Sequence, residues 1–264
     1  MINLNNLEIC RVPFCQIDRD FRLTDFSLTP HVSALEYSIQ KIGITHPLLL
    51  VRRNEGYGII SGHRRFQLAE SLKLPDLPAR VVDTPDEISM LETNLIENAS
   101  HRQYSDVEKS LILQKFFTLG VPEKQVTDKI LPILGLEKNR KLYVDLLDVE
   151  TLPQGLRLLM HEMKAPLRYF SVCFRWEIAS LVAVEALLAS LRPGLNKLRD
   201  MLALLDETAQ CGQTTVAELL SRATILAVLK NDNLSSHDKY DRIFQEIYQW
   251  RYPMLSDMKK RVLL

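Results

Sequence analysis

The sequence predicts a small α+β domain at the N-terminus, followed by a region that is entirely α-helical. Over the first hundred residues, short apolar runs typical of strands alternate with segments whose apolar residues recur every three or four positions, as in helices. After Ser100 the strand patterns stop and the helical patterns continue. With 264 residues, 46% hydrophobic and 25% charged, the chain can bury more than one core, which excludes a disordered chain or a disulfide-stapled mini-protein.

Each helix and strand of the α+β part is predicted by a separate sequence pattern. The helix over residues 33–42 has apolar residues at spacings of four and three, and Gly43 closes it. The continuous apolar run over residues 47–51 predicts a buried strand, and the polar residues after it predict a turn into a returning strand. The expected strands cover residues 12–17, 47–51, 57–60 and 79–82, and the expected helices cover residues 33–42, 63–72 and a segment from Pro85 onward.

The helical region begins with a capping box. Ser105 and Glu108 stand in the S-x-x-E spacing that opens a helix, and Gly120 ends it. The leucines farther along show no sustained heptad, which favours packed helices over a coiled coil. Further helices are expected over residues 122–131, 138–148 and 153–163, and in a region from 171 to 264 that is broken at Pro193-Gly194, Gly212, residues 231–236 and Pro253. We therefore expect three domains, over residues 1–103, 104–170 and 171–264.

Composition excludes several classes of protein. The longest nearly apolar run, Ile178–Leu191, has 14 residues and contains Glu185, whereas a bilayer span needs about 20. The chain opens without a signal-peptide pattern, and its four cysteines show neither C-x-x-C nor zinc-ligand spacing. A cytoplasmic protein without a membrane partner is therefore expected. Because 33 basic side chains balance 33 acidic ones, any nucleic-acid binding needs a local basic patch.

One turn carries basic residues where a helix disfavours them. A predicted strand ends at Ser61-Gly62, and the helix after it begins with His63, Arg64 and Arg65. Cations in a first helical turn oppose the macrodipole, whose positive end lies there. An anion removes this conflict, and a glycine turn with backbone N–H groups and arginine side chains is suited to phosphate. The alternative is that both arginines point to solvent and pair with nearby carboxylates.

A second polar group follows near the end of the next predicted helix. Glu97 and Asn98 stand there, and their side-chain oxygens could hold a magnesium ion carried by phosphates. Taken alone, this pattern is more typical of an ordinary polar helix C-terminus.

Four stretches then follow one another in a specific order. They are residues 35–51, which end in GITHPLLLV, residues 57–69 with YGIISGHRR, residues 78–81 with PARV, and residues 95–98 with LIEN. Together they cover about a third of the chain and resemble the N-terminal domain of the ParB family of chromosome and plasmid partition proteins. The helices between 106 and about 165 resemble the helix-turn-helix domain of the same family.

The resemblance implies a nucleotide site. In the family, the Gly-x-Arg-Arg turn holds the triphosphate of CTP, and a Glu-Asn pair lies beside the phosphates and magnesium. Carried over to this sequence, the phosphate ligands would be Ser61, Gly62, His63, Arg64, Arg65 and Asn98, and the metal ligand would be Glu97. His63 replaces the usual glutamate, and His101 replaces the arginine that usually follows the Glu-Asn pair. The identity of the nucleotide and its hydrolysis, as by a slow CTPase, therefore stay open.

The resemblance also implies DNA binding. In this interpretation residues 122–131 form the first helix, Pro132–Leu136 form the turn, and Glu137–Leu147 form the recognition helix. The start of that helix would contact bases and phosphates, and it carries Lys138, Asn139, Arg140 and Lys141. The alternative is a solvated cluster of charges on the surface.

We therefore expect a DNA-binding protein with a role in partition or a related regulation, controlled by a nucleoside triphosphate, CTP with Mg²⁺ first. The expected partners are DNA, the nucleotide, a second copy of the chain and a protein that contacts the helices after residue 171. Two other classes fit the same domain: a phosphoryl-transfer enzyme resembling a free-serine kinase, and an interaction scaffold that has lost the nucleotide. A sulfiredoxin is excluded because no cysteine lies between Cys15 and Cys173, and no metal cluster specific to a nuclease is present.

Overall fold

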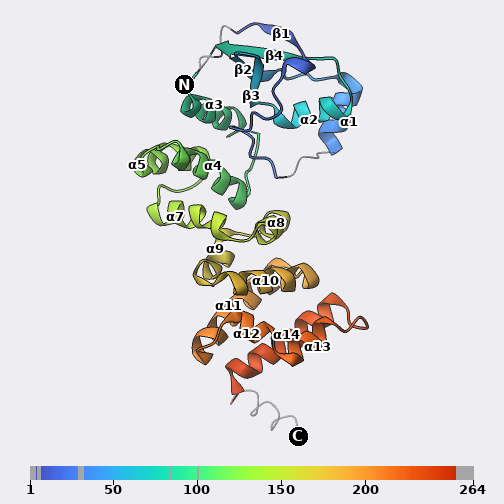
Figure 1. Ribbon diagram of the computed structural model, residues 1–264, viewed down its shortest axis with the longest axis vertical. Coiled ribbons are helices and arrows are strands. Elements are labelled where there is room, and N and C mark those ends of the chain that lie inside the picture. Colours follow the sequence, from blue (N-terminus) through green and yellow to red (C-terminus); the bar gives the residue numbers. More distant parts are fainter. Residues whose placement is uncertain (1–3, 5–6, 29–32, 84, 100, 254–264) are drawn as a thin grey trace. The chain divides into compact units, whose positions relative to one another are not determined.

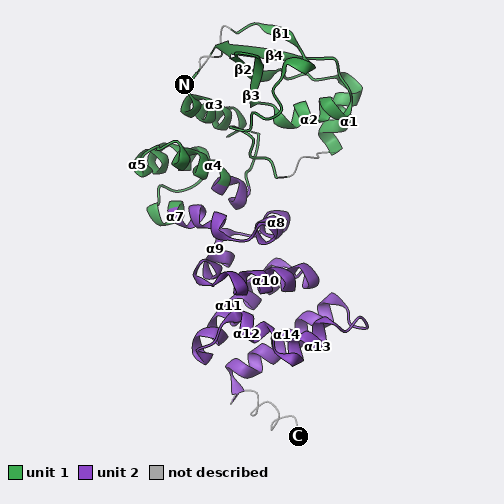
Figure 2. Cartoon of the chain, viewed as in Figure 1, with its two compact units in different colours: residues 1–104, 111–143 green, residues 105–110, 144–264 purple. Residues whose placement is uncertain are grey.

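The chain forms two compact units. The computed structural model describes residues 4, 7–28, 33–83, 85–99 and 101–253 (Figure 1). One unit comprises residues 1–104 and 111–143, and the other comprises residues 105–110 and 144–264 (Figure 2). This division into two units does not test the three domains expected from the sequence, which stay a prediction. The helical pattern expected beyond Pro253 lies outside the described residues.

A mixed four-stranded sheet forms the centre of the first unit. Its order across the sheet is β1-β4-β2-β3. β2 and β3 pair antiparallel as a hairpin, β4 runs parallel to β2, and β1 runs antiparallel to β4. The strands are β1 (Ile9–Pro13), β2 (Leu48–Arg53), β3 (Gly56–Ser61) and β4 (Asp76–Asp83). The α+β class predicted for the N-terminal part is confirmed.

Helices cover both faces of this sheet. They are α1 (Ser33–Ile42), α2 (His63–Ser71) and α3 (Glu87–Ala99), and α1 packs against α2 (Figure 1). Successive side chains of a strand point to opposite faces, so Leu50 packs with Phe66 of α2 whereas Val51 packs with Met90 of α3. Because both of its faces are buried, β2 has the continuous apolar run that predicted it.

The strand expected over residues 12–17 is wrong in its second half. β1 ends at Pro13, and Phe14–Gln16 form a 3₁₀ turn. The ring of Phe14 stacks on that of Phe66, with 4.7 Å between the ring centroids. The end of the apolar run therefore supplies a core contact to α2 instead of continuing the strand.

The helices expected to form a helix-turn-helix differ from the prediction in their bounds. The first is a continuous helical run made of α5 (Glu123–Gln125), a π-helical turn (Val126–Ile130) and α6 (Leu131–Ile133). Pro132 lies inside this run, in the first turn of α6, where a missing N–H is tolerated. The second helix, α7 (Arg140–Asp148), begins three residues later than expected. Asn139 explains this start, because its side-chain oxygen accepts a hydrogen bond from the Leu142 N–H at 3.2 Å.

Among its described residues, every element of the second unit is a helix or a 3₁₀ turn, and the helix that follows Ser105 belongs to this unit only as far as Ser110. The capping box is confirmed at the start of α4 (Asp106–Thr118): the Ser105 N–H donates to Glu108 at 3.0 Å, and the Glu108 N–H donates to Ser105 Oγ at 3.2 Å. The other helices are α8 (Gln154–Glu162), α9 (Leu167–Phe170), α10 (Ile178–Leu191), α11 (Leu195–Gly212), α12 (Val216–Leu220), α13 (Ala223–Leu229) and α14 (Ser236–Arg251), with 3₁₀ turns at Val149–Thr151 and Ser171–Arg175.

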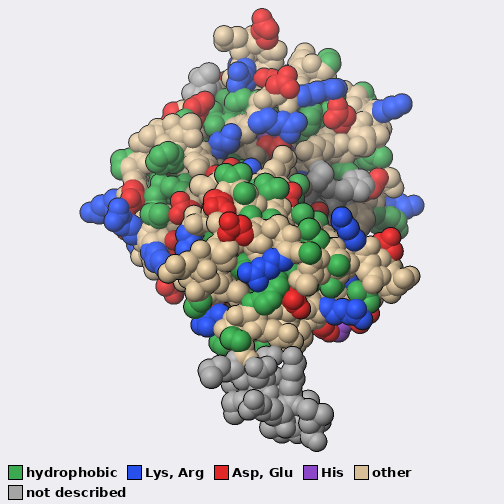
Figure 3. Space-filling model, turned by 60° about the horizontal axis from the view of Figure 1, so that its bottom comes forward, with side chains coloured by type: hydrophobic (Ala, Val, Ile, Leu, Met, Phe, Trp, Pro, Cys, Tyr) green, Lys and Arg blue, Asp and Glu red, His purple; other side chains and the backbone are tan. Residues whose placement is uncertain are grey.

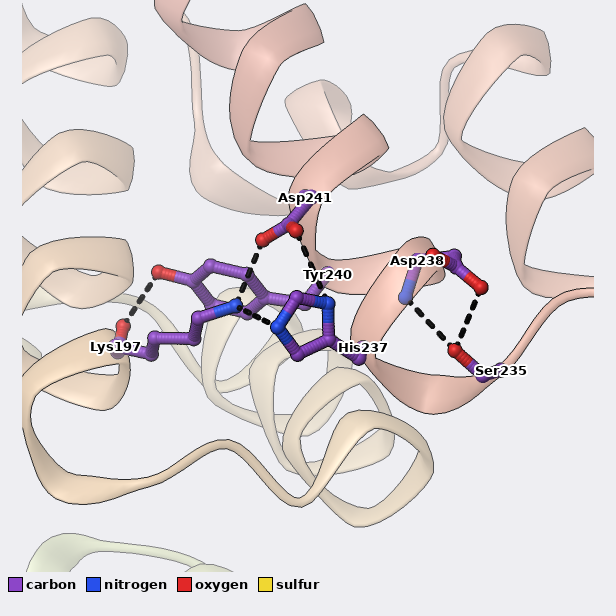
Figure 4. Close-up of polar contacts among 6 residues, drawn as sticks. All are labelled: Lys197, Ser235, His237, Asp238, Tyr240 and Asp241. Atoms are coloured by element: carbon purple, nitrogen blue, oxygen red, sulfur yellow. Dashed lines mark hydrogen bonds and ion pairs between the residues drawn. The ribbon is translucent and has the colours of Figure 1, made fainter.

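Polar contacts join α11 to α14 (Figure 4). Lys197 Nζ donates to Asp241 Oδ1 at 2.7 Å, and the Tyr240 hydroxyl donates to the Lys197 carbonyl at 2.8 Å. At the start of α14, Ser235 Oγ accepts from the Asp238 N–H at 3.1 Å and caps the helix. Exposed ion pairs stabilise little, so we attribute most of this packing to the buried apolar residues of both helices.

Charges of both signs share the surface. On the face that Figure 3 draws, Lys and Arg side chains are interspersed with Asp and Glu rather than gathered into one patch. Among the described residues, no helix combines the length and the apolar character that a membrane span requires.

Candidate functional site

A cleft of about 680 Å³ opens in the first unit where β3 ends and α2 begins. Its walls bring together the turn at Gly62–Arg65 and the end of α3, which lie more than thirty residues apart in the sequence. Other lining residues come from the segment before α1, from α1 and from the residues after α3. The full lining is Thr24, Ser27, Leu35, His46, Gly62, His63, Arg64, Arg65, Asn94, Glu97, Asn98, His101 and Arg102. Ser61, also expected in this site, is buried and does not line the cleft.

Gly62 makes the turn from β3 into α2. Its φ of 107° and ψ of 18° lie in the left-handed region, and a Cβ here would stand 2.9 Å from Leu48 Cγ. No described side chain caps the N-terminus of α2. The first backbone N–H groups of the helix and the positive end of its dipole therefore face the turn without a side-chain acceptor.

The two arginines of the turn have different surroundings. Arg65 Nη1 donates to the His46 carbonyl at 2.6 Å and to the Pro47 carbonyl at 2.7 Å, so this guanidinium also fixes the segment before β2. Burial lowers the pKa of Arg65, and the nearby Glu97 carboxylate raises it. Arg64 is half-buried and lines the cleft.

His63 is the first residue of α2 and is 9% exposed. Its Nε2 lies 3.0 Å from Thr24 Oγ1. Burial lowers the pKa of His63 to about 4, the positive charges of Arg22 and Arg102 lower it further, and Asp25 opposes them. The imidazole is therefore uncharged at neutral pH, and the arginines supply the positive charge of the turn.

On α3, three polar side chains face the cleft at helical spacing. Asn94 Nδ2 donates to the Ile60 carbonyl at 2.6 Å, and Asn98 Nδ2 donates to the Asn94 carbonyl at 2.7 Å. Glu97 Oε2 is buried and has no hydrogen-bond partner among the described residues. A buried carboxylate oxygen of this kind requires a cation or a donor, so Glu97 fits a divalent cation. Among the described residues, no group of three or more His, Cys, Asp or Glu could hold a metal by itself. Phosphate oxygens would therefore have to complete the coordination.

The residues expected to contact DNA lie elsewhere in the first unit. Lys138 and Asn139 precede α7, while Arg140 and Lys141 begin it, and all four are exposed. Arg140 Nε donates to Glu123 Oε1 at 2.7 Å. Lys138 and Lys141, the other two cations of this group, are exposed and form no ion pair with the described residues.

The family model of the ParB N-terminal domain matches residues 6–99. This part of the chain is a ParB N-terminal domain. The match begins before β1 and ends with α3, so it contains the sheet, both of its helical layers and the whole phosphate turn. The resemblance inferred from the sequence for the N-terminal part is thereby confirmed.

Several curated relatives of the chain are named as chromosome- or plasmid-partitioning proteins. The chain is 31% identical over 93 residues to the chromosome-partitioning protein Spo0J of Thermus thermophilus, covering 35% of this chain and 34% of the relative. A probable plasmid-partitioning protein ParB of the same organism is 25% identical over 204 residues, covering 66% and 67%. Stage 0 sporulation protein J of Bacillus subtilis is 28% identical over 132 residues, covering 50% and 44%. The matches thus span between a third and two thirds of these relatives.

Solved ParB structures are also similar to the chain. The truncated ParB of Caulobacter crescentus complexed to the centromeric parS site is 14% identical, covers 74% of this chain and 98% of that chain, and has a TM-score of 0.40. The same protein complexed with CTP-gamma-S is 18% identical, covers 68% and 92%, and has a TM-score of 0.28. A Pnob8-like ParB-N domain is 15% identical, covers 91% and 97%, and has a TM-score of 0.41.

Asn94 and Thr24 are among the cleft residues to which the sequence analysis assigned no role. Asn94 stands three and four residues before Glu97 and Asn98, so helical spacing could have found it. Thr24 lies 39 residues before His63, in a segment with no local motif, and only the folded chain brings the two together.

Proposed function

We propose that the cleft of the ParB N-terminal domain binds a nucleoside triphosphate with Mg²⁺, and that the bound state controls how the chain binds DNA in partition or a related role. The observation that supports this most strongly is that one cleft contains both a group suited to an anion and a group suited to a cation. The uncapped start of α2 with Arg64 and Arg65 suits an anion, and the partnerless buried oxygen of Glu97 suits a cation. A triphosphate with a divalent cation satisfies both.

The residues of the turn would bind the phosphates. The N–H groups after Gly62 donate to phosphate oxygens, and the helix dipole favours their negative charge. Arg64 supplies a charged, planar donor, which suits phosphate better than an ammonium does. When bound, magnesium would neutralise phosphate charge, and Glu97 and Asn98, which line the same cleft, are the residues that would hold it.

The nucleoside would lie toward the other wall. Thr24 and Ser27 precede α1, and Leu35 lies on it, so this wall offers hydroxyl groups and an apolar side chain. A volume of about 680 Å³ is in the range of small-molecule sites. We name CTP first because the ParB resemblance of the turn implies it.

Control of DNA binding would pass through the end of α3. Glu97 and Asn98 lie in the last turn of this helix, Arg102 follows it, and α4 begins at Asp106. A ligand that binds one arrangement of these residues better than another shifts the population toward it. The exposed Lys138 and Lys141 near the start of α7 would supply phosphate contacts to DNA.

Thermal unfolding with CTP, ATP, GTP and UTP, each with magnesium, tests the proposal. A ligand at 100 times its Kd stabilises the fold by about 2.7 kcal/mol, and we expect this for one nucleotide selectively. Arg64→Ala is expected to weaken binding about 100-fold. Arg52→Ala is the matched control, because Arg52 lies on β2 outside the cleft in an exposed pair with Asp83.

The alternatives give other results. No stabilisation by any of the four nucleotides contradicts the proposal and indicates an interaction scaffold. Consumption of nucleotide that does not change when DNA is added and is lost in Glu97→Gln indicates a phosphoryl-transfer enzyme. The second copy of the chain, expected as a partner, is checked by light scattering with and without nucleotide.

A further inference from the structure

Thr24 joins the segment before α1 to the first turn of α2. Its side chain is buried, and its hydroxyl donates to the Ile59 carbonyl at 2.8 Å. The same oxygen lies 3.0 Å from Nε2 of His63. A hydroxyl has one proton, and Ile59 takes it, so the proton between Thr24 and His63 belongs to the imidazole. Nε2 therefore carries the proton, and in the neutral ring Nδ1 can only accept.

The surroundings keep this ring in one state. Burial opposes a charge on it, and the charged groups near it are mainly positive. These are Arg22 and Asp25 on the segment before α1, Arg64 and Arg65 on α2, Glu97 on α3, and Arg102 after α3. The carboxylate of Asp25, the residue next to Thr24, accepts a hydrogen bond from Arg22 Nη1 at 2.6 Å. This negative charge is therefore already paired with a positive one.

We propose that Thr24 and His63 form a positioning pair, in which a neutral imidazole with a fixed tautomer holds the nucleoside wall of the cleft against the phosphate turn. His63 acts through Thr24 and adds no cation to the phosphates. The inference rests on the proposed nucleotide site and adds a specific role for the residue that replaces the family glutamate. The hydrogen bonds run from α2 to Thr24 and on to β3, so they fix Thr24 and with it the neighbouring Ser27.

Two substitutions at Thr24 separate the hydroxyl from the shape of the side chain. Thr24→Val keeps the size and removes both hydrogen bonds, which leaves the Nε2 proton and the Ile59 carbonyl without these partners. Thr24→Ser keeps the hydroxyl and is the matched control. If Thr24→Val fails to fold, His63→Leu removes the same link from the other side.

The tautomer can be measured without any nucleotide. The full chain has six histidines, so long-range ¹H–¹⁵N spectra of histidine-labelled protein resolve them, and His63→Leu assigns the signal. We expect a neutral ring protonated at Nε2 from pH 8 to pH 5.5 in the parent protein and in Thr24→Ser. Thr24→Val should show both tautomers. A parent His63 protonated at Nδ1, or charged at pH 5.5, overturns the inference.

Calorimetric titration with the magnesium nucleotide tests the positioning role. Thr24→Ser should bind within about twofold of the parent, and Thr24→Val about tenfold more weakly, with the loss independent of pH between 6 and 8. Equal affinity of Thr24→Val and the parent overturns the positioning role even if the tautomer is as expected. Absence of binding in the parent contradicts the proposed function itself, and the positioning role then falls with it, whereas the spectra still decide the tautomer.

Discussion

The starts of α2 and α7 carry similar residues and differ in how their backbone is satisfied. Both helices begin with basic side chains, His63-Arg64-Arg65 in α2 and Arg140-Lys141 in α7. Asn139 caps α7 through its bond to the Leu142 N–H, whereas no described side chain caps α2. A capped helix start with exposed cations can attract a distant polyanion, but only the uncapped start can bind phosphate through its backbone. Basic residues at a helix start therefore mark an anion site only when the N–H groups are left for the ligand.

The largest effect is expected from a Cβ at the turn into α2. Gly62→Ala should destabilise the fold by about 3 kcal/mol, because it adds left-handed strain to a clash with Leu48. It should also abolish nucleotide binding. Urea unfolding measures the first effect and calorimetry the second. Gly43→Ala is the matched control: it has φ of 75° but no atom within 4 Å of the added Cβ, so it should cost about 1 kcal/mol and leave binding intact.

The same comparison shows what the sequence could predict. The conflict between Arg64, Arg65 and the helix dipole is a local property, and it located the turn before any fold was known. The strand β2 and the helix α2 were also predictable, because β2 is a continuous apolar run and α2 has apolar residues at helical spacing. The hydrogen bonds from Arg65 to the His46 and Pro47 carbonyls join segments that are distant in the chain. No spacing in the sequence predicts them.

Local sequence patterns predicted the wrong bounds of an element where a side chain makes a contact outside that element or caps it. The apolar run after Val12 continues into Phe14, which leaves the strand to stack on Phe66. The helix-turn-helix interpretation placed the start of the second helix at Glu137, whereas Asn139 caps this helix and delays its start to Arg140. Thr24 has no distinguishing neighbours, and its role depends on burial beside His63.

The start of α2 also carries a buried histidine, His63, which the start of α7 lacks, and this residue should make the stability of the fold depend on pH. The folded pKa of His63 is about 4, below the ordinary value of 6.5, so between these values the unfolded chain binds a proton that the folded chain does not. Stability from this group is complete above pH 6.5 and is lost as pH falls toward 4. The slope should approach about 1.4 kcal/mol per pH unit in that window. Urea unfolding at pH 7, 6, 5 and 4.5 measures it.

His63→Gln is the control for the pH dependence, because glutamine does not titrate. The difference in free energy of unfolding between the parent and His63→Gln should shrink as pH falls from 6.5. Parallel pH profiles for the two proteins would contradict the assignment of a lowered pKa to His63, and would place the acid sensitivity in other groups.

The smallest expected effects concern α7 and separate its cap from its charges. Lys138→Ala with Lys141→Ala should reduce the slope of log K against log salt for DNA by about two, with unchanged stability, because each exposed cation would release one counterion. Asn139→Ala should do the reverse: the helix loses its cap at a cost of about 1 kcal/mol, while the salt slope is kept. Asn139→Ser restores a capping oxygen and should restore stability. A salt slope that falls in Asn139→Ala but not in the double lysine variant would mean that this helix start binds phosphate as α2 is proposed to do, and the distinction between the two helix starts would fail.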